Sequence, residues 1–241
     1  MSFSTVAEIY DRINSNAYEP YADMLVSNFA LADIEVKEVL DLGCGTGGIC
    51  ALLADKGFDM VALDVSPEML NFARERNYGK NTLLLCQDMR EFELYGTVQA
   101  VYSSFDCLNY LSSVKDLKKV FSLVFNYLEK GGLFIFDVNT EFRYLSVFDR
   151  KSYIYEFEDS MTVWQSEFFP EESVCEFAID TFFELENGDY SRSTEIQTQK
   201  LFSHEDIISA AKGFKLVSKT GGKGFDGCSE DEKDYYIFKR I

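Results

Sequence analysis

Short apolar runs and helical segments alternate along the first 140 residues. The apolar runs are Lys37–Leu42, Asp59–Asp64, Thr82–Gln87, Val98–Ser103 and Leu133–Phe136. Their length and their content of Val, Leu, Ile and Phe indicate strands that are covered on both faces. Because helical spacing separates them, we expect strand–helix repeats and a doubly wound parallel sheet of the α/β class.

Three helices are expected between these strands. The first runs from Ile49 to Lys56, directly after a glycine-rich turn. The second begins at Pro67, behind a serine N-cap, and ends near Gly79. The third is Val114–Glu129, whose apolar residues recur at helical spacing, and we expect Gly131-Gly132 to stop it.

The pattern changes to a period of two after about residue 150. Tyr153, Tyr155 and Phe157 alternate with polar neighbours, and the residues from Cys175 to Leu185 do the same. This period indicates antiparallel strands with one buried face. The pair Asn187-Gly188 is typical of a tight hairpin turn.

A mixed pattern returns at the C-terminal end. We expect a helix from Ser203 to Lys212, ended by Gly213, and then strands at Phe214–Lys219 and Asp234–Arg240. No linker, repeat or low-complexity tract interrupts the chain, so one compact unit is predicted. The expected parts are an α/β domain of residues 1–150 and 203–241, and an antiparallel insertion of residues 151–202.

Net charge excludes several partners. The chain has 23 Lys and Arg against 41 Asp and Glu, a formal charge of −18. Nucleic-acid and anionic-lipid binding both depend on basic residues, so neither is expected. We find no signal-peptide pattern and no run of about 18 apolar residues, which predicts a cytoplasmic protein. Monomer and homodimer both remain open.

Cysteine and histidine give no sign of a disulfide or metal framework. The six cysteines form no C-x-x-C pair, and we interpret them as free buried thiols. His204 is the only histidine, so no metal site is expected. The cysteines are Cys44, Cys50, Cys86, Cys107, Cys175 and Cys228.

A glycine-rich turn follows the first strand and fits two templates. Gly43, Gly45 and Gly48 match the dinucleotide pattern G-x-G-x-x-G. Gly43, Gly45 and Gly47 match a turn that cradles S-adenosylmethionine. The glycines leave both templates open, because each ligand needs close approach of backbone at a helix N-terminus.

Three carboxylates follow strand ends and carry more information. Asp41 would repel a pyrophosphate and attract an ammonium and a sulfonium, although it could simply hold the turn. Asp64 can accept hydrogen bonds from the ribose hydroxyls of either cofactor. Asp88 could accept from an adenine amino group while Met89 packs on the ring; a helix-capping Asp and a core Met are the alternative.

Five ordered motifs together resemble class I S-adenosylmethionine-dependent methyltransferases. They occupy residues 39–47, 62–70, 87–89, 104–111 and 128–140. The resemblance implies a strand order of 3-2-1-4-5-7-6, with the cofactor at the carboxyl ends of the strands. The cofactor-binding residues that it implies are Asp41, Gly43, Gly45, Gly47, Asp64, Val65, Met69, Gln87, Asp88, Met89, Ser104 and Phe105.

The insertion is similar to one that roofs the acceptor pocket in small-molecule N- and O-methyltransferases. We therefore expect in-line methyl transfer to a nitrogen or oxygen of a small molecule. A non-catalytic S-adenosylmethionine sensor and an NAD-dependent oxidoreductase are the alternatives. Candidates for the acceptor pocket, each also explicable by packing, are Tyr10, Tyr18, Tyr21, Asn109, Tyr110, Asn139 and Trp164.

The sequence contains no convincing general base. Tyr10, Asn109 and Asn139 are the only catalytic candidates, and they are weak ones. His204 is expected beside a helix N-cap, away from the cofactor motifs. An amine acceptor that is already neutral needs no base, because alignment of the nucleophile supplies much of the rate.

Acidic residues are concentrated in the predicted insertion. Residues 151–196 hold twelve acids and two bases, a net charge of −10. We interpret them as the solvated outer face of an exposed sheet. The alternative is that some of them attract a cationic or amine-bearing acceptor.

Overall fold

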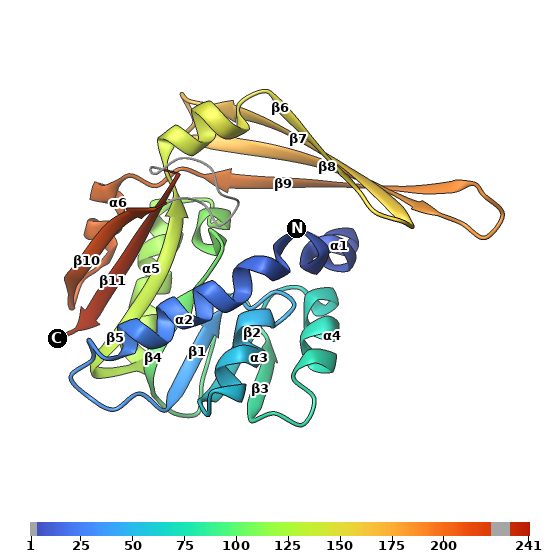
Figure 1. Cartoon of the computed structure of the whole chain (residues 1–241). Coiled ribbons are helices and arrows are strands. Elements are labelled where there is room, and N and C mark those ends of the chain that lie inside the picture. The colour runs from blue at the N-terminus through green and yellow to red at the C-terminus, as the bar shows by residue number, and fades with distance from the viewer. Residues whose placement is uncertain (1–3, 223–231) are drawn as a thin grey trace.

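Seven strands form the main sheet of the computed structural model, which describes residues 4–222 and 232–241 (Figure 1). Helices cover both faces of this sheet, and a second sheet of four strands lies above the carboxyl ends of its parallel strands. The main-sheet strands are β1 (Glu38–Leu42), β2 (Asp59–Asp64), β3 (Thr82–Cys86), β4 (Val98–Ser103), β5 (Leu128–Asn139), β10 (Phe214–Gly222) and β11 (Lys233–Arg240).

Strand order in the main sheet is β3-β2-β1-β4-β5-β11-β10. The first five strands are parallel, and β11 runs antiparallel to both β5 and β10. When the four inserted strands are left out of the numbering, this order is 3-2-1-4-5-7-6. The predicted doubly wound α/β fold is confirmed.

Helices and single turns connect the strands. Helix α3, between β1 and β2, begins one residue earlier than predicted. Ser66 caps the next helix, α4 (Pro67–Arg76), because its side chain accepts a hydrogen bond from the backbone N–H of Met69 at 3.1 Å. Ser203 and Asp206 form a capping box on α6. The elements are α1 (Ser4–Asn14), η1 (Ser15–Ala17), α2 (Tyr18–Phe29), α3 (Gly48–Asp55), α4 (Pro67–Arg76), η2 (Cys107–Tyr110), α5 (Val114–Tyr127), η3 (Arg143–Phe148) and α6 (His204–Ala210).

The boundary between α5 and β5 differs from the prediction. The helix ends at Tyr127 rather than Glu129, and the strand begins at Leu128 instead of Leu133. Gly131 and Gly132 therefore lie inside a strand and do not stop the helix. Gly131 has a φ of +83°, which lets the strand bend while Leu128 still pairs with β4.

The central strands bury both of their faces. Leu40 and Leu42 of β1 pack in a cluster with α5 and α6, and Val39 packs in another with α2 and α3. Asp41 is the next residue of β1 on that second face. An apolar strand with one acid at its carboxyl end therefore points this carboxylate at the edge where the parallel strands terminate.

The insertion is an antiparallel sheet in the order β6-β7-β8-β9. The period-two pattern is confirmed, since Cys175, Phe177 and Ile179 are buried and their neighbours are not. The hairpin turn at Asn187-Gly188 has three residues between Leu185 and Asp189, and the backbone N–H of Leu185 donates to the carbonyl of Asp189. Gly188 in this turn has a φ of +82°. The strands are β6 (Lys151–Glu156), β7 (Ser160–Phe169), β8 (Val174–Glu184) and β9 (Tyr190–Lys200).

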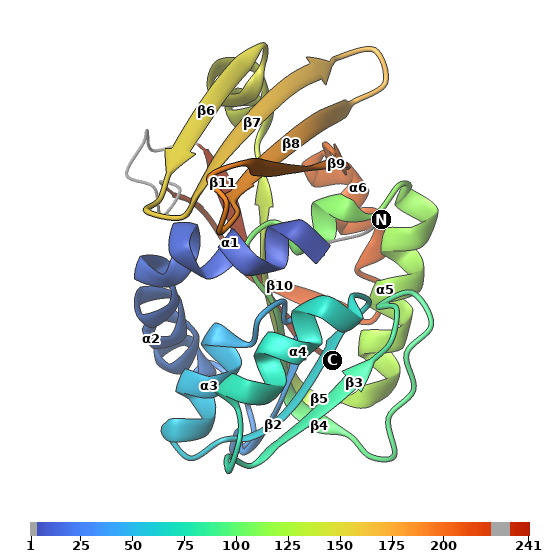
Figure 2. The same cartoon turned by 90° about the vertical axis from the view of Figure 1, so that its right-hand side faces the viewer.

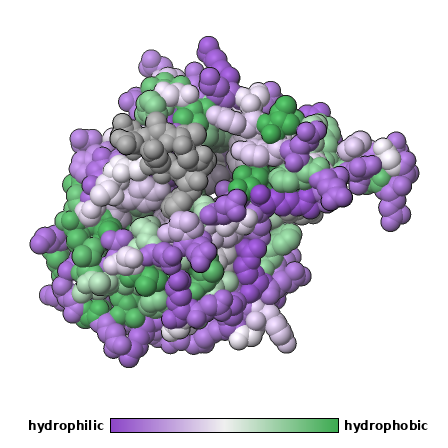
Figure 3. All heavy atoms as spheres, viewed as in Figure 1, coloured by the Kyte–Doolittle hydropathy of each residue, from purple (hydrophilic) through white to green (hydrophobic). Residues whose placement is uncertain are grey.

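Helix α1 lies between the insertion and the rest of the molecule (Figure 2). A third apolar cluster joins Ala7 of α1, Met69 of α4 and Phe177 of β8. The β8–β9 hairpin projects from the molecule, and Figure 3 shows its tip chiefly in the hydrophilic colour. The tip of the β8–β9 hairpin therefore lies away from the rest of the molecule.

The cysteines are less uniformly buried than predicted. Cys50 and Cys175 are buried, but Cys86 at the end of the edge strand β3 is exposed. Cys44 and Cys107 are half-buried free thiols, and Cys228 lies outside the described residues. Within residues 4–222 and 232–241, no helix is long and apolar enough to cross a membrane.

Candidate functional site

The glycine-rich turn between β1 and α3 forms one wall of a small cavity. Gly43, Gly45 and Gly47 all have positive φ, between +53° and +88°, which only glycine adopts without strain. The other walls come from α1, α2 and the segment after β4. The lining residues are Tyr10, Tyr18, Asp41, Gly43, Cys44, Gly45, Thr46, Gly48, Ile49, Ser104 and Phe105.

Asp41 lies at the bottom of this cavity and is 1% exposed. Its Oδ2 accepts from the hydroxyl of Tyr102 at 2.5 Å, whereas Oδ1 has no hydrogen-bond partner among the described residues. Burial raises the pKa of Asp41 to about 8, although the Tyr102 bond lowers it. A buried acid with one unpaired oxygen is suited to receive a cation such as an amino acid's ammonium group.

Asp64 holds the glycine-rich turn in shape. One carboxylate oxygen accepts from the backbone N–H of Gly45 at 2.8 Å, and the other from Ser66 at 2.9 Å. Burial raises the pKa of Asp64, and these backbone bonds oppose the rise. Each oxygen keeps a further lone pair, so a diol could still be bound at this position.

Gly43 is required because another side chain lies directly against it. A Cβ at this position would be 2.2 Å from Sγ of Cys107 and 3.4 Å from the methyl group of Met89. Residues of η2 and of the loop after β3 therefore pack on the turn itself. At Gly45 the nearest atom to such a Cβ belongs to Tyr10, at 3.9 Å.

The cavity is much smaller than the cofactor that the motifs imply. It encloses about 20 Å³, whereas sites for ligands of such a size usually span roughly 300–1,000 Å³. Tyr10 of α1 and Tyr18 of α2 line it, and Tyr10 also packs against the apolar cluster that includes Phe177 of the insertion. The chemistry of the lining fits S-adenosylmethionine, but a ligand of that size needs more room than this cavity provides.

A polar cluster fastens α1 to the glycine-rich turn. The carboxylate of Asp11 accepts from the hydroxyls of Tyr18 at 2.6 Å and Thr46 at 2.5 Å, and it pairs with Arg76 of α4. The next residue, Arg12, pairs in the other direction with Asp159 of the insertion. Helix α1 is thus bonded both to the α/β domain, through Asp11, and to the insertion, through Arg12.

Other predicted cofactor residues lie outside the cavity lining. Gln87 bonds the backbone of Glu93, and Asp88 is chelated by the guanidinium of Arg90. Arg90 lowers the pKa of Asp88. The cavity lining also lacks Gly47, which belongs to the turn itself, and the neighbouring residues Asp64, Val65, Met69 and Met89. Val65 is exposed, and Met69 is buried in the cluster that includes Ala7 of α1.

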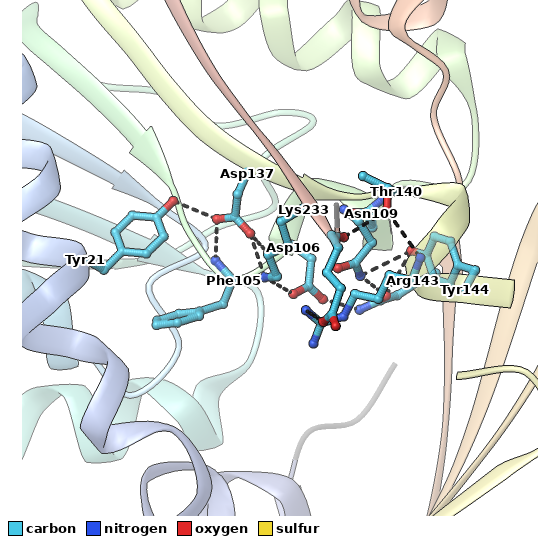
Figure 4. Close-up of polar contacts among 12 residues, drawn as sticks. Tyr21, Phe105, Asp106, Asn109, Asp137, Thr140, Arg143, Tyr144 and Lys233 are labelled. Atoms are coloured by element: carbon cyan, nitrogen blue, oxygen red, sulfur yellow. Dashed lines mark hydrogen bonds and ion pairs between the residues drawn. The ribbon is translucent and has the colours of Figure 1, made fainter. Parts of the chain in front are cut away.

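The segment after β4 carries two strained residues. Phe105 and Asp106 both have positive φ, +55° and +53°, which costs non-glycine residues roughly 1–3 kcal/mol each. Asp137, at the end of β5, compensates by accepting from both backbone N–H groups at 2.8 Å (Figure 4). The hydroxyl of Tyr21 donates to the same carboxylate at 2.6 Å.

Lys233 of β11 joins this arrangement from the other side. Its Nζ lies 2.7 Å from Asp106 and 2.7 Å from Asp137, and its side chain is 4% exposed. Burial alone lowers the pKa of Lys233, but the two carboxylates outweigh it and hold the pKa above its ordinary value. A second buried pair, Arg143 with Glu232, lies beside it.

The underside of β9 presents a row of buried polar side chains. Glu195, Gln197 and Gln199 lie two residues apart on one face of the strand and are each at most 7% exposed. Gln199 donates to Asp106 at 2.6 Å, and Gln197 accepts from the hydroxyl of Tyr110 at 2.8 Å. This row connects the insertion to the segment after β4.

Both asparagine candidates take part in the same connection. Asn109 donates to the carbonyl of Lys200 and accepts from the backbone N–H of Asn139. Asn139 donates to Gln199 at 2.9 Å, while its side-chain oxygen is buried with no hydrogen-bond partner in the described part of the chain. Burial raises the pKa of Tyr144, whose hydroxyl also bonds Gln199.

Two candidates for the acceptor pocket, and the single histidine, lie away from the cavity. Tyr21 is fully buried in the apolar cluster of α2, and Trp164 packs edge-on against Phe177 inside the insertion. His204 stacks on Tyr236 and hydrogen-bonds its hydroxyl at 3.0 Å, far along the chain from the cofactor motifs. The structure brings Tyr10 and Tyr18, but not these three, to the glycine-rich turn.

Sequence reasoning missed several residues of the site. Thr46 lies within the glycine-rich motif, and Asp137 follows an apolar strand just as Asp41 does, so both signals were present in the sequence. Asp11 and Lys233 had no local signal, because their partners are distant in sequence. Only the folded chain identifies such residues.

Comparison with known proteins supplies the family context. A family model described as "Methyltransferase domain" matches residues 39–132. The putative methyltransferase YqeM of Bacillus subtilis is 34% identical over 222 residues, which cover 90% of this chain and 87% of that protein.

Solved structures show the same similarity. An S-adenosylmethionine-dependent methyltransferase from Clostridium acetobutylicum aligns with a TM-score of 0.84 and 26% identity, over 99% of this chain and 98% of that one. CalS10, an amino pentose methyltransferase from Micromonospora echinaspora, aligns with a TM-score of 0.77 and 20% identity, over 97% of each chain.

Proposed function

We propose, from the premise that this chain belongs to the S-adenosylmethionine-dependent methyltransferases, that it methylates a nitrogen or oxygen of a small polar molecule. The observation that carries the proposal is the buried polar row on β9, which reaches Asp106 beside the cavity. The amides of this row offer both donors and acceptors, so the row favours an acceptor whose N–H or O–H groups can replace the hydrogen bonds that these side chains now make within the protein.

Residues of the glycine-rich turn would hold the cofactor. Asp41 would bind the ammonium group through its unpaired oxygen, and Asp64 would accept from the ribose hydroxyls. The bound cofactor supplies a methyl group on a sulfonium, which is an electrophile without further activation. The protein therefore has to orient the acceptor, exclude water and leave room for in-line attack.

The insertion would form the roof over the acceptor. Tyr110 and Gln197 meet across the gap between η2 and β9, and Asn139 and Gln199 do so nearer to β5. An acceptor would exchange these internal hydrogen bonds for its own. CalS10, whose fold this chain shares, is described as acting on an amino pentose, which is one example of a small polar acceptor.

A ligand titration tests the cofactor assignment. S-adenosylmethionine and S-adenosylhomocysteine are expected to raise the thermal midpoint of the protein, and NAD(H) is not. Asp64→Ala alone cannot assign the ribose contact, because Asp64 also bonds Gly45 and Ser66. Stabilisation by NAD(H) and not by the other two ligands would overturn the proposal.

A metabolite screen separates an enzyme from a binding sensor. Fractionated small-molecule extracts are added with S-adenosylmethionine, and the release of S-adenosylhomocysteine is measured. We expect release that depends on one fraction containing amines or alcohols. Tight cofactor binding with no release in any fraction would favour the sensor.

A further inference from the structure

Asp106 lies at the boundary between the cavity and the insertion. Its neighbour Phe105 lines the cavity, and its own carboxylate accepts from Gln199 of β9. Figure 4 shows Asp106 in the middle of the network, between Phe105 and Asp137 on one side and Arg143 on the other.

Backbone strain makes this boundary dependent on its supports. Phe105 and Asp106 hold positive φ only while the carboxylate of Asp137 accepts from both N–H groups. That carboxylate is fully buried, so it must itself be neutralised by a nearby cation. The position of Phe105 at the cavity therefore depends on the cation that pairs with Asp137.

Lys233 is that cation, and it also bonds Asp106. Its Nζ lies 5.9 Å from the ring centre of Phe105, so the ammonium contacts both carboxylates of the boundary and lies near the aromatic ring. Among the residues that the structure describes, the buried cluster has two cations, Lys233 and Arg143, against the carboxylates of Asp106, Asp137 and Glu232, which leaves a charge of −1 when all five are ionised. Without Lys233 the charge would be −2.

We infer that Lys233 is a positioning residue for methyl transfer: it holds the Phe105–Asp106 segment at the cofactor cavity and limits the negative charge there. The inference rests on the proposed function, since it concerns the same site. Two consequences follow. Loss of the ammonium lets the segment relax, which weakens binding of any adenosyl ligand. It also makes the local field more negative, which favours a sulfonium over a neutral thioether.

Affinity measurements on matched variants test the first consequence. Titration calorimetry with S-adenosylhomocysteine compares Lys233→Met and Lys233→Arg with Lys239→Met. Lys239 lies on the same strand and pairs with Asp33 away from the site. We expect affinity to fall about tenfold in Lys233→Met, about threefold or less in Lys233→Arg, and less than twofold in Lys239→Met.

The second consequence distinguishes positioning from a loss of structure. The ratio of affinities for S-adenosylmethionine and S-adenosylhomocysteine should rise about threefold in Lys233→Met and fall in Asp106→Asn, because the two ligands differ by the methyl group that gives the sulfur its positive charge, and only that charge responds to a change in the local field. A merely loosened fold lowers both affinities and leaves the ratio unchanged. Tyr21→Phe removes a donor to Asp137 but no charge, so its ratio should equal that of the wild type.

Circular dichroism and thermal midpoints establish that each variant is folded. A folded Lys233→Met with wild-type affinity for S-adenosylhomocysteine and an unchanged ratio overturns the inference. Where Lys233→Met does not fold, the ratio in Asp106→Asn decides instead, and an unchanged value overturns the inference. A wild-type protein that binds neither ligand would refute the proposed function, which is a different result.

Discussion

The hydroxyl of Tyr102 donates to one oxygen of Asp41 at 2.5 Å and leaves the other oxygen facing the glycine-rich turn. In the free protein this buried carboxyl has a pKa of about 8 because burial disfavours its charged form. A cationic ligand that pairs with Asp41 must displace its proton at neutral pH. Under the proposed contact between Asp41 and the cofactor's ammonium group, cofactor binding is therefore expected to be coupled to proton release.

Affinity for S-adenosylhomocysteine should consequently rise with pH. Between pH 6 and pH 8 we expect an increase of up to about tenfold per pH unit, which levels off above the pKa of Asp41. Calorimetry at pH 6.5 in two buffers of different ionisation enthalpy should detect the release of about one proton. Asp41→Asn should bind more weakly and lose this pH dependence; a variant that retained it would show that another group titrates.

The same residue should limit the stability of the free protein. The folded-state pKa of Asp41 lies above the unfolded value of 3.8, so its contribution to stability is full below about pH 4 and is lost as the pH rises to about 8. Asp41→Asn removes this pH-dependent loss of stability, because an amide does not ionise. At pH 8 this variant should have a higher free energy of unfolding than the wild type, by urea denaturation, while it binds less cofactor. Lower stability at pH 8 would contradict the prediction.

Two glycines of the turn should respond differently to alanine. At Gly45 a new Cβ would make no close contact, so Gly45→Ala is destabilised only by the positive φ of the backbone. It should lower the free energy of unfolding by about 1–2 kcal/mol. Gly43→Ala also drives a Cβ into Cys107 and should cost at least about 3 kcal/mol. Urea denaturation without ligand measures both.

A double variant separates space from strain at Gly43. Cys107→Ala removes the sulfur that blocks the new Cβ, so the double variant should be less destabilised than the sum of the two single variants. It should not reach wild-type stability, because the positive φ remains. Simple additivity would show that the contact with Cys107 is not what excludes a side chain.

The polar cluster around Asp11 should slow cofactor exchange. Helix α1 covers a cavity too small for the cofactor, and Asp11 bonds it to Thr46 and Arg76. Asp11→Ala should raise the association and dissociation rates of S-adenosylhomocysteine several-fold, as followed by stopped-flow fluorescence. The control is Asp23→Ala, which breaks an exposed bridge to Lys56. Equal rates in both variants would mean that α1 does not gate the site.

How much of the molecule the sequence predicts depends on the distance between interacting residues. The alternation of strands and helices, the glycine-rich turn and the inserted sheet follow from local period and turn residues, whereas the strand order followed from the resemblance of the ordered motifs to a known family. Asp41 and Asp64 could be chosen because each lies at the carboxyl end of an apolar strand. The error at Gly131-Gly132 also has a local cause, because a pair of glycines after a helical pattern predicts the end of the helix. In the structure, pairing with β4 on both sides of the glycines makes them a bend within β5.

The acceptor side could not be predicted in the same way. Its central contacts join Asp106 to Gln199, 93 residues later, and to Lys233, 127 residues later. No pattern within one element marks these residues, and Lys233 alone looks like any basic residue at the start of a strand. Asn109, Asn139 and Tyr110 were selected by their place after strands, but their bonding partners became visible only in the structure.

The acidity of the insertion can now be divided by exposure. Among its twelve acids, only Glu195 is buried, and Asp180 is half-buried in a pair with Arg192. The other ten are exposed, which supports their interpretation as a solvated face. Glu195 lies on the underside of β9, where its carboxylate accepts from Gln197 at 2.7 Å. An effect of this charge on the acceptor should therefore come from Glu195.

Glu195→Gln tests this effect once the metabolite screen has supplied an acceptor. If that acceptor is a cation, KM should rise about tenfold or more while the affinity for S-adenosylhomocysteine stays within twofold, because a buried charge is lost without a change of shape. Glu176→Gln is the matched control: the same substitution on the neighbouring strand, at an exposed position. Exposed charges are screened by salt, so the control should leave KM unchanged at 0.15 M salt. Equal KM values in the two variants would show that the acids of the insertion serve as a solvated face and do not affect acceptor binding. Acceptor recognition would then depend on the uncharged amides of Gln197 and Gln199.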